Sequence, residues 1–211
     1  MILLRRIFFA GAAAAMVSFM CGTMGPNAGS ETTSGVKIAS FGDTICVTTV
    51  PGTTLMIFDE RYSPGDTLRY ADTAVVGDNG RVVFTDLPAG LYNIFAYPDL
   101  STTGAAVLGI PVSTFSIISD SAQFSSLKAV TGTVTSQGQP DSLAEVFIAG
   151  SFHFSTTNNQ GNYRLDNVPP GSYTVVARHS PSWGRSGSDS VNVDIAINDR
   201  ASSITANFTL Q

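Results

Sequence analysis

One segment of this 211-residue chain occurs twice, and the repeat constrains the fold more than any other feature. Residues 80–96 align with residues 161–177 without a gap, and five residue types recur at matching positions. In the first copy these are Gly80, Pro88, Gly90, Tyr92 and Ala96. Apolar positions recur as well, and repeats of this kind should be identified before a fold is assigned. The sequence therefore predicts two copies of one structural module.

Each copy contains two turns that flank a short strand. Gly80 and its counterpart Gly161 end turns that contain Asn, which binds its own backbone, while glycine tolerates positive φ. In the second turn Pro169 presets φ, and Gly171 is expected to close the reversal with a positive φ. Apolar residues then alternate from Tyr173 onward, as in a half-buried strand. We expect this tyrosine ring in the core and its hydroxyl near the sheet edge.

The rest of the chain after residue 21 also reads as short strands, and no amphipathic helix is evident there. Many short strands with regular turn signals predict an all-β fold class. We expect two tandem β-sandwiches, residues 36–128 and 129–211, joined by a short, stiff link. Strands are predicted over 52–58, 111–119, 122–128, 130–135, 144–148, 190–197 and 203–210.

The N-terminus has the form of an export signal. Arg5 and Arg6 precede an uncharged run from Ile7 to Met20. A basic start followed by a short apolar run is typical of a secretory signal, and this run is too short to span a bilayer comfortably. Residues 1–21 are therefore predicted to form a signal helix, and Gly- and Ser-rich residues 22–35 a flexible tether.

Cys21 ends the apolar run and is followed by Gly22, which resembles a bacterial lipoprotein signal. The resemblance implies that Cys21 is lipidated and anchors an exported protein in a membrane of the cell envelope or at the cell surface. Ser18 and Met20 depart from the family's preference for an aliphatic and a small residue at these places. Ordinary cleavage near Cys21 and an uncleaved anchor are the alternatives.

Cys46 lies in a strand-like run and has no evident partner if Cys21 is lipidated. It is interpreted as a small buried hydrophobe, with a disulfide or a reactive thiol as the alternative. Two cysteines at these positions give neither a metal-ligand spacing nor a disulfide framework.

The charged residues argue against several classes of function. The net charge of −5 disfavours a nucleic-acid partner, which would require a basic patch. His153 and His179 are the two histidines, and neither belongs to a metal-binding or hydrolase motif. We expect His153 at the surface. The sequence predicts a protein that is not an enzyme, with no catalytic residue, metal or cofactor.

Residues 129–211 resemble the carboxypeptidase regulatory-like domain. The resemblance is carried by Gly132-Thr-Val134, Gly138-Gln-Pro140, Ala144-Glu-Val146, Gly161-Asn-Tyr163 and Asn167-Val-Pro-Pro-Gly-Ser-Tyr173. It implies a prealbumin-like Greek-key β-sandwich with a carbohydrate-binding-like fold. Domains of this family are non-catalytic and serve as spacers or binding modules.

A related sandwich, the collagen-adhesin B-type module, forms an internal isopeptide bond. Lys128 and Asn207 could supply the pair, but Asn167 occupies the place of the required acid. We therefore do not expect this bond.

Two functions follow from these features. The first is a non-catalytic, membrane-anchored lipoprotein that acts as a structural spacer or interaction module. The alternative is a surface module that binds a glycan or an envelope protein through Trp183 and Arg185. These two residues lie in a polar segment between strands, and function concentrates in loops.

Overall fold

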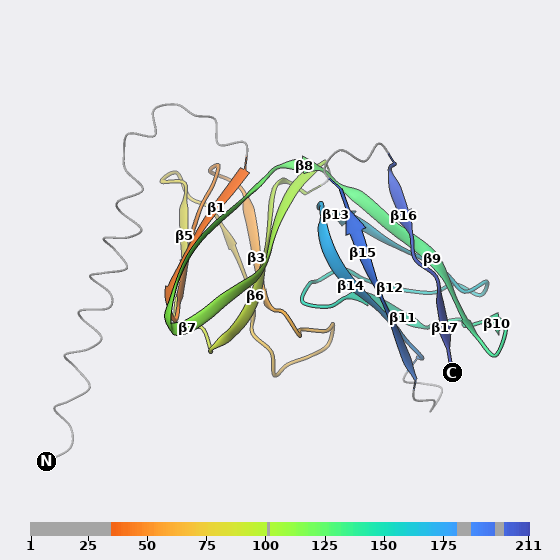
Figure 1. The fold of residues 1–211 in the computed structure, drawn as a ribbon. Coiled ribbons are helices and arrows are strands. Elements are labelled where there is room, and N and C mark those ends of the chain that lie inside the picture. The colour runs from red at the N-terminus through yellow and green to blue at the C-terminus, as the bar shows by residue number, and fades with distance from the viewer. Residues whose placement is uncertain (1–34, 101, 181–186, 197–200) are drawn as a thin grey trace, which may run out of the picture.

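The computed structural model describes residues 35–100, 102–180, 187–196 and 201–211. The regular secondary structure of these residues consists of β-strands alone (Figure 1). No helix capable of crossing a bilayer occurs in the described residues. The strands are β1 (Gly35–Gly42), β2 (Thr44–Thr48), β3 (Thr54–Asp59), β4 (Ala71–Val75), β5 (Arg81–Phe84), β6 (Gly90–Asp99), β7 (Thr103–Gln123), β8 (Ser125–Ser126), β9 (Lys128–Ser136), β10 (Gln139–Pro140), β11 (Glu145–Ile148), β12 (Phe154–Thr156), β13 (Asn162–Val168), β14 (Gly171–Arg178), β15 (Ser188–Ile195), β16 (Ser203–Thr205) and β17 (Phe208–Leu210).

Strands β1 to β8, here called the N-terminal half, form a single sheet that folds over on itself. The strand order is β4-β3-β6-β7-β1-β2-β5, with β8 paired to β7. Strand β7 makes the fold-over possible, because its first part pairs with β6 and its second part with β1. The two parts of the sheet enclose a common core that contains Ile38 and Val47 from one side and Ile57 and Ile94 from the other.

The prediction of two strands over 111–119 and 122–128 is wrong, because β7 is continuous over 21 residues. Ser119 and Ser121 pair with Ala39 and Lys37 of β1, so the polar stretch between them stays in the ladder. The prediction placed a break at Asp120 and Ser121, but strand pairing overrides such local preferences.

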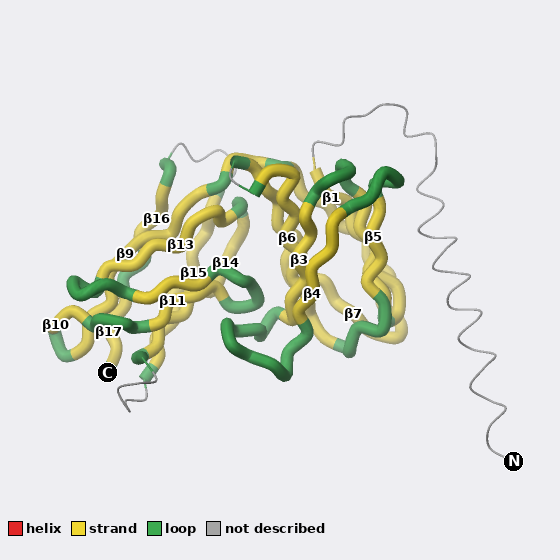
Figure 2. The backbone as a smooth tube through the Cα atoms, turned by 180° about the vertical axis from the view of Figure 1, so that it is seen from behind, coloured by secondary structure: helices red, strands yellow, loops and turns green. Residues whose placement is uncertain are grey.

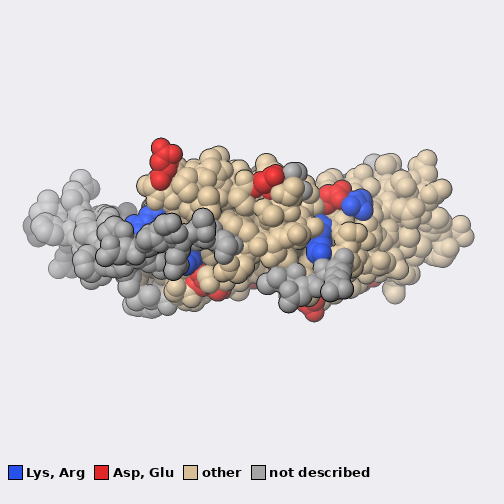
Figure 3. Space-filling view, turned by 90° about the horizontal axis from the view of Figure 1, so that it is seen from above, with Lys and Arg blue, Asp and Glu red and all other residues tan. Residues whose placement is uncertain are grey.

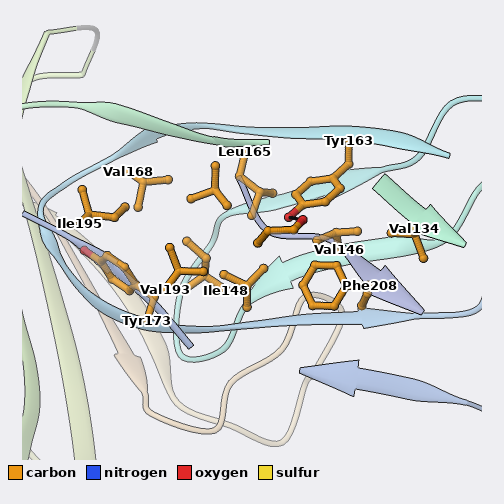
Figure 4. Packing of buried hydrophobic residues seen from close by; sticks show 14 of the residues in the cluster. Val134, Val146, Ile148, Tyr163, Leu165, Val168, Tyr173, Val193, Ile195 and Phe208 are labelled. Atoms are coloured by element: carbon orange, nitrogen blue, oxygen red, sulfur yellow. Dashed lines mark hydrogen bonds between the residues drawn. The ribbon is translucent and has the colours of Figure 1, made fainter. Parts of the chain in front are cut away.

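Strands β9 to β17, the C-terminal half, form a β-sandwich of two sheets. One sheet has the order β10-β9-β13 with β16 and β17 beside β9, and the other has the order β12-β11-β14-β15. Both β16 and β17 run parallel to β9. The apolar side chains of the two sheets meet in the core, with Tyr173 near one end and Tyr163 and Phe208 near the other (Figure 4).

The predicted strand over 203–210 is divided at Ala206 and Asn207, between β16 and β17. The main-chain oxygen of Ala206 turns inward and accepts a hydrogen bond of 2.7 Å from the Tyr163 hydroxyl. Gly132 of β9 passes directly beneath it, where a Cβ atom would overlap this oxygen. A buried tyrosine hydroxyl needs such a partner, and the interruption of the strand supplies it.

The repeated segments share one local geometry. The Tyr92 hydroxyl donates to the oxygen of Pro88 at 2.7 Å, and the Tyr173 hydroxyl donates to the oxygen of Pro169 at 2.9 Å. Both rings are buried, as predicted. Each tyrosine therefore stabilises, through this hydrogen bond, the turn that precedes its own strand.

Gly171 does not have the positive φ that we expected for it. The left-handed residue of this turn is Asn167, with φ of 60°, and its counterpart in the first copy is Asp86, with φ of 58°. Asn and Asp tolerate this conformation better than other non-glycine residues. Gly171 is instead required by packing, since a Cβ atom would lie 2.9 Å from the Tyr173 hydroxyl oxygen and 3.0 Å from the ring carbon that bears it.

We predict that Gly171→Ala destabilises the protein by about 1–3 kcal/mol, because the new methyl group overpacks the site and displaces the Tyr173 ring. Gly90→Ala is the matched control in the first copy, where the nearest atoms would be 3.9 Å from the new Cβ. That variant should change the free energy of unfolding by less than about 1 kcal/mol. Urea denaturation of both variants measures the difference, and equal midpoints would refute the packing explanation.

The two halves lie side by side and share part of their cores (Figures 1 and 2). Phe58, Phe95 and Tyr97 of the N-terminal half belong to the same buried cluster as the core of the C-terminal half. Phe95 and Tyr97 are at most 1% exposed. The apolar surface between the halves is therefore continuous with the interior of the C-terminal half.

Candidate functional site

The site residues predicted from sequence, Cys21, Trp183 and Arg185, lie outside the described residues. Lipidation of Cys21 and binding through Trp183 and Arg185 therefore stay predictions. On the face seen in Figure 3, the charged side chains of the described residues lie singly or in small groups on a largely uncharged surface.

Cys46 lies in β2 and is 7% exposed, which agrees with a buried position. Its sulfur is disulfide-bonded, which is the alternative interpretation of this residue rather than the preferred one of a simple buried hydrophobe. Since the chain contains two cysteines, an intrachain disulfide at Cys46 and a lipid on the Cys21 sulfur exclude each other.

Asp141 and His179 form a buried pair that resembles part of a hydrolase triad. Nδ1 of His179 lies 2.6 Å from Oδ2 of Asp141, and both side chains are at most 4% exposed. In a triad the other ring nitrogen would face a nucleophile. Here Nε2 of His179 lies 3.4 Å from the main-chain oxygen of Gln211, beside β17. The pair therefore links the residue after β14 to the residue after β10 and to the residue after β17, and we assign it a structural role.

A polar contact joins the two halves at Gly150, in the loop after β11. The Gly150 amide donates to the oxygen of Tyr62 at 2.8 Å, and the Asn93 side-chain amide donates to the oxygen of Gly150 at 3.1 Å. Oδ1 of Asn93 also accepts from the Gly109 amide at 2.9 Å, which fixes the side chain within its own half. The loop after β3 and the loop after β11 lie side by side at this point (Figure 2).

Aromatic rings fill the contact next to Gly150. The ring of Phe95 in β6 lies 6.3 Å from that of Phe152 and 6.4 Å from that of Tyr173, with the Phe95 and Tyr173 rings stacked. The rings of Tyr97 and Phe152 are 5.9 Å apart in an edge-to-face arrangement. Pairs of this geometry stabilise a contact beyond the area that they bury. The seam, as we call this contact, consists of Phe58, Tyr62, Asn93, Phe95, Tyr97, Gly150, Phe152, His153 and Tyr173.

His153 lies within the seam and is 4% exposed, so the prediction of a surface position is wrong. Packing of the two halves covers it, and nothing in its local sequence reveals that packing. Its Nε2 atom lies 3.1 Å from the oxygen of Asn167 and 3.4 Å from the Tyr97 hydroxyl, and its Nδ1 atom lies 3.2 Å from Oγ of Ser151. Burial lowers the pKa of His153 from 6.5 to about 4, against the opposing effect of the Asn167 hydrogen bond.

The buried tyrosines of the seam have raised pKa values. Burial is the main cause for both Tyr97 and Tyr173, because an ionised phenol would lose its hydration there. The seam is therefore an uncharged site at neutral pH, suited to holding two surfaces together.

No cluster of potential metal ligands occurs among the described residues. The two candidate residues of an isopeptide bond, Lys128 and Asn207, lie at different places along β9. Lys128 pairs with Val168 at the start of β9, whereas Oδ1 of Asn207 accepts from the Thr133 amide. Five residues along a strand separate the two sites by roughly 16 Å.

The seam was not predicted from the sequence, although one feature of strand β6 indicates it. In the second copy, strand β14 has Thr174, Val176 and Arg178 on its outer face, in ordinary alternation with the core residues. The corresponding positions of β6 hold Asn93, Phe95 and Tyr97, so that residues 94–97 form an uninterrupted apolar run. Such a run is typical of a strand covered on both faces. The Asp141–His179 pair gave no such signal.

A family model described as the carboxypeptidase regulatory-like domain matches residues 129–211. This confirms the resemblance for that part of the chain. No curated protein matches the sequence.

Several solved structures are similar to this chain at low identity. The minor pilin of Streptococcus agalactiae is 13% identical with a TM-score of 0.36, over 78% of this chain and 84% of that one. The TIE protein of Bacillus anthracis is 11% identical with a TM-score of 0.32, over 79% of this chain and 36% of that one. The major pilin subunit of Bacillus cereus is 11% identical with a TM-score of 0.32, over 83% of this chain and 59% of that one. These values carry no inference about function.

We predict that Gly150→Ala weakens the seam by about 1–3 kcal/mol beyond the cost of its backbone conformation. Gly150 has φ of +67°, and a Cβ atom there would overlap Nδ2 of Asn93 and lie 2.6 Å from the oxygen of Glu60. Gly138→Ala is the matched control, because Gly138 has φ of +75° and open space around it.

Thermal or urea denaturation compares these two variants. The control should show only the strain of an alanine at positive φ, about 1–2 kcal/mol. A loss of stability no larger for Gly150→Ala than for Gly138→Ala would show that the close contact across the seam contributes nothing.

Proposed function

We propose that this protein is a non-catalytic, exported and membrane-anchored protein in which two tandem prealbumin-like β-sandwich modules form a rigid spacer or interaction unit of the cell envelope. The anchor would be a lipid on Cys21 or, where Cys46 forms the disulfide, an uncleaved N-terminal segment, with residues 22–35 as the tether. The proposal extends the family match of residues 129–211 to the repeated segment in the first half.

The observation that carries the spacer role is the burial of Phe95 and Tyr97 by the C-terminal half. Most domain pairs within one chain move relative to each other unless the interface between them is large and hydrophobic. The seam is apolar and is reinforced by hydrogen bonds from Gly150 and Asn93. A single residue, Leu127, lies between β8 and β9, so the connection is also short.

Small-angle X-ray scattering of the mature chain at pH 7 tests the spacer role. A rigid unit should give a scattering curve that the side-by-side arrangement reproduces with one conformation for residues 36–211. A curve that requires a broad range of separations between the halves would rule out a rigid spacer.

Lipidation is tested independently by metabolic labelling with a fatty-acid probe. The wild-type protein and the control Cys46→Ser should be labelled, whereas Cys21→Ser should not, because the thioether requires the Cys21 sulfur. Equal labelling of the wild type and Cys21→Ser would contradict the lipid anchor. Faster migration of the wild-type chain without reductant than with it would instead favour the intrachain disulfide.

A further inference from the structure

We propose that His153 makes the seam acid-sensitive, so that protonation of its imidazole ring releases the two halves from each other. This inference goes beyond the spacer role and requires neither the lipid anchor nor a ligand. It rests on the position of the ring between the halves and on the groups that surround it.

The ring is enclosed by residues of both halves. Phe95 of β6 lies 5.6 Å away in an edge-to-face arrangement, and Phe152 stacks on the ring at 4.2 Å. The Tyr97 hydroxyl lies 3.4 Å from Nε2. Because Phe95 and Tyr97 belong to the other half, the ring can become fully hydrated only when the halves separate.

Among the residues that the structure describes, no carboxylate affects the pKa of His153 appreciably, so none compensates a charge at this position. The titratable groups that face the site are Tyr97 of β6 and, behind the Phe95 ring, Tyr173 of β14. Both phenols are neutral at acid pH. Glu60, in the loop after β3, approaches Gly150 through its main chain. Asn167 contributes its main-chain oxygen, which favours a proton on the ring but is outweighed by burial in its effect on the pKa of His153.

The hydrogen bonds of the site can be satisfied by a neutral ring. Oγ of Ser151 donates its hydrogen to the oxygen of Ile148, so it can only accept from Nδ1 of His153. A neutral imidazole carries one N–H, and with that hydrogen on Nδ1 the other nitrogen, Nε2, can accept from the Tyr97 hydroxyl at 3.4 Å. A second proton would displace this Tyr97 hydrogen bond from Nε2. The Asn167 oxygen at 3.1 Å could accept the new N–H, but burial outweighs that gain.

These groups define the direction of the pH effect. The pKa of His153 is about 4 in the closed seam and would return toward 6.5 when the ring is exposed to water. The open state thus binds the proton more tightly, and the contribution to seam stability that is present above pH 6.5 is lost as pH falls toward 4. A difference of about 2.5 pKa units corresponds to a shift of roughly 300-fold in the equilibrium between closed and open states.

Each half retains a core of its own when the seam opens. The buried cluster that contains Ile38 and Val47 lies wholly within the N-terminal half. The C-terminal sandwich keeps the packing between its two sheets, with residues such as Val134 and Phe208. Opening can therefore proceed as a separation of folded halves about Leu127.

Hydrogen exchange of the full chain in detergent tests this inference, with rates corrected for the intrinsic effect of pH. The Gly150 amide, bonded to Tyr62, reports on the seam, whereas the amides of Val76 and Val134, bonded to Thr53 and Gly161, report on the two halves. Between pH 7 and pH 4 the protection of Gly150 should fall by about 100-fold, because at pH 4 a ring with a closed-state pKa of about 4 is half protonated even in the closed seam. Val76 and Val134 should keep their protection.

Two variants complete the experiment. His153→Gln should remove the pH dependence at Gly150, and His179→Gln, which alters the other buried histidine, should retain it. The inference is overturned if Gly150 is equally protected at both pH values, if all three amides lose protection together, or if His153→Gln responds to acid as the wild type does.

A second measurement on the wild type keeps the test decisive if His153→Gln fails to fold. NMR titration of the His153 ring protons should give a midpoint well below 6.5, and a midpoint at 6.5 would overturn the inference. Scattering at pH 7 tests the spacer role separately, because a rigid unit at neutral pH is compatible with either result of the acid titration.

Discussion

The arrangement of the molecule depends on strand β6 being buried on both faces. One face, with Tyr92, Ile94 and Ala96, completes the core of the N-terminal half. The other face presents Phe95 and Tyr97 to the C-terminal half. Burying a large aromatic side chain contributes about 1.5–3 kcal/mol relative to leaving it exposed, so separation of the halves has a substantial cost. Strand β14, its counterpart in the second copy, covers only one core and leaves Thr174 exposed on its outer face.

The same turn, closed by a hydrogen bond from a tyrosine hydroxyl to a proline oxygen, occurs in both halves but with different packing around it. In both copies a tyrosine hydroxyl binds the proline oxygen four residues before it, and a left-handed Asp or Asn begins the turn. What differs is the glycine that follows the turn. Gly171 is pressed against the tyrosine ring, whereas Gly90 has free space around it. Packing therefore explains the glycine of the second copy, whereas neither packing nor a positive φ requires Gly90 in the first.

Much of the fold could be predicted from the sequence because its signals are local. Alternation and turn residues located β3, β9, β11 and β15 within a few residues, and the strand class was correct throughout the described residues. Contacts between distant segments were not predictable in this way. The continuity of β7, the burial of His153 and the Asp141–His179 pair all depend on tertiary neighbours, and the predicted sites at Cys21 and Trp183 lie outside the described residues.

The parallel pairing of β17 with β9 has a mechanical consequence. Strand β9 begins the C-terminal half, and Phe208 and Leu210 of β17 pair with Val134 and Ser136 near its end. A pulling force between the start of β9 and the end of β17 runs along both strands, in opposite senses. The hydrogen bonds that join them are then loaded in shear and must break together, whereas an antiparallel terminal hairpin would open one bond at a time. Under tension, the C-terminal half would yield abruptly and at high force.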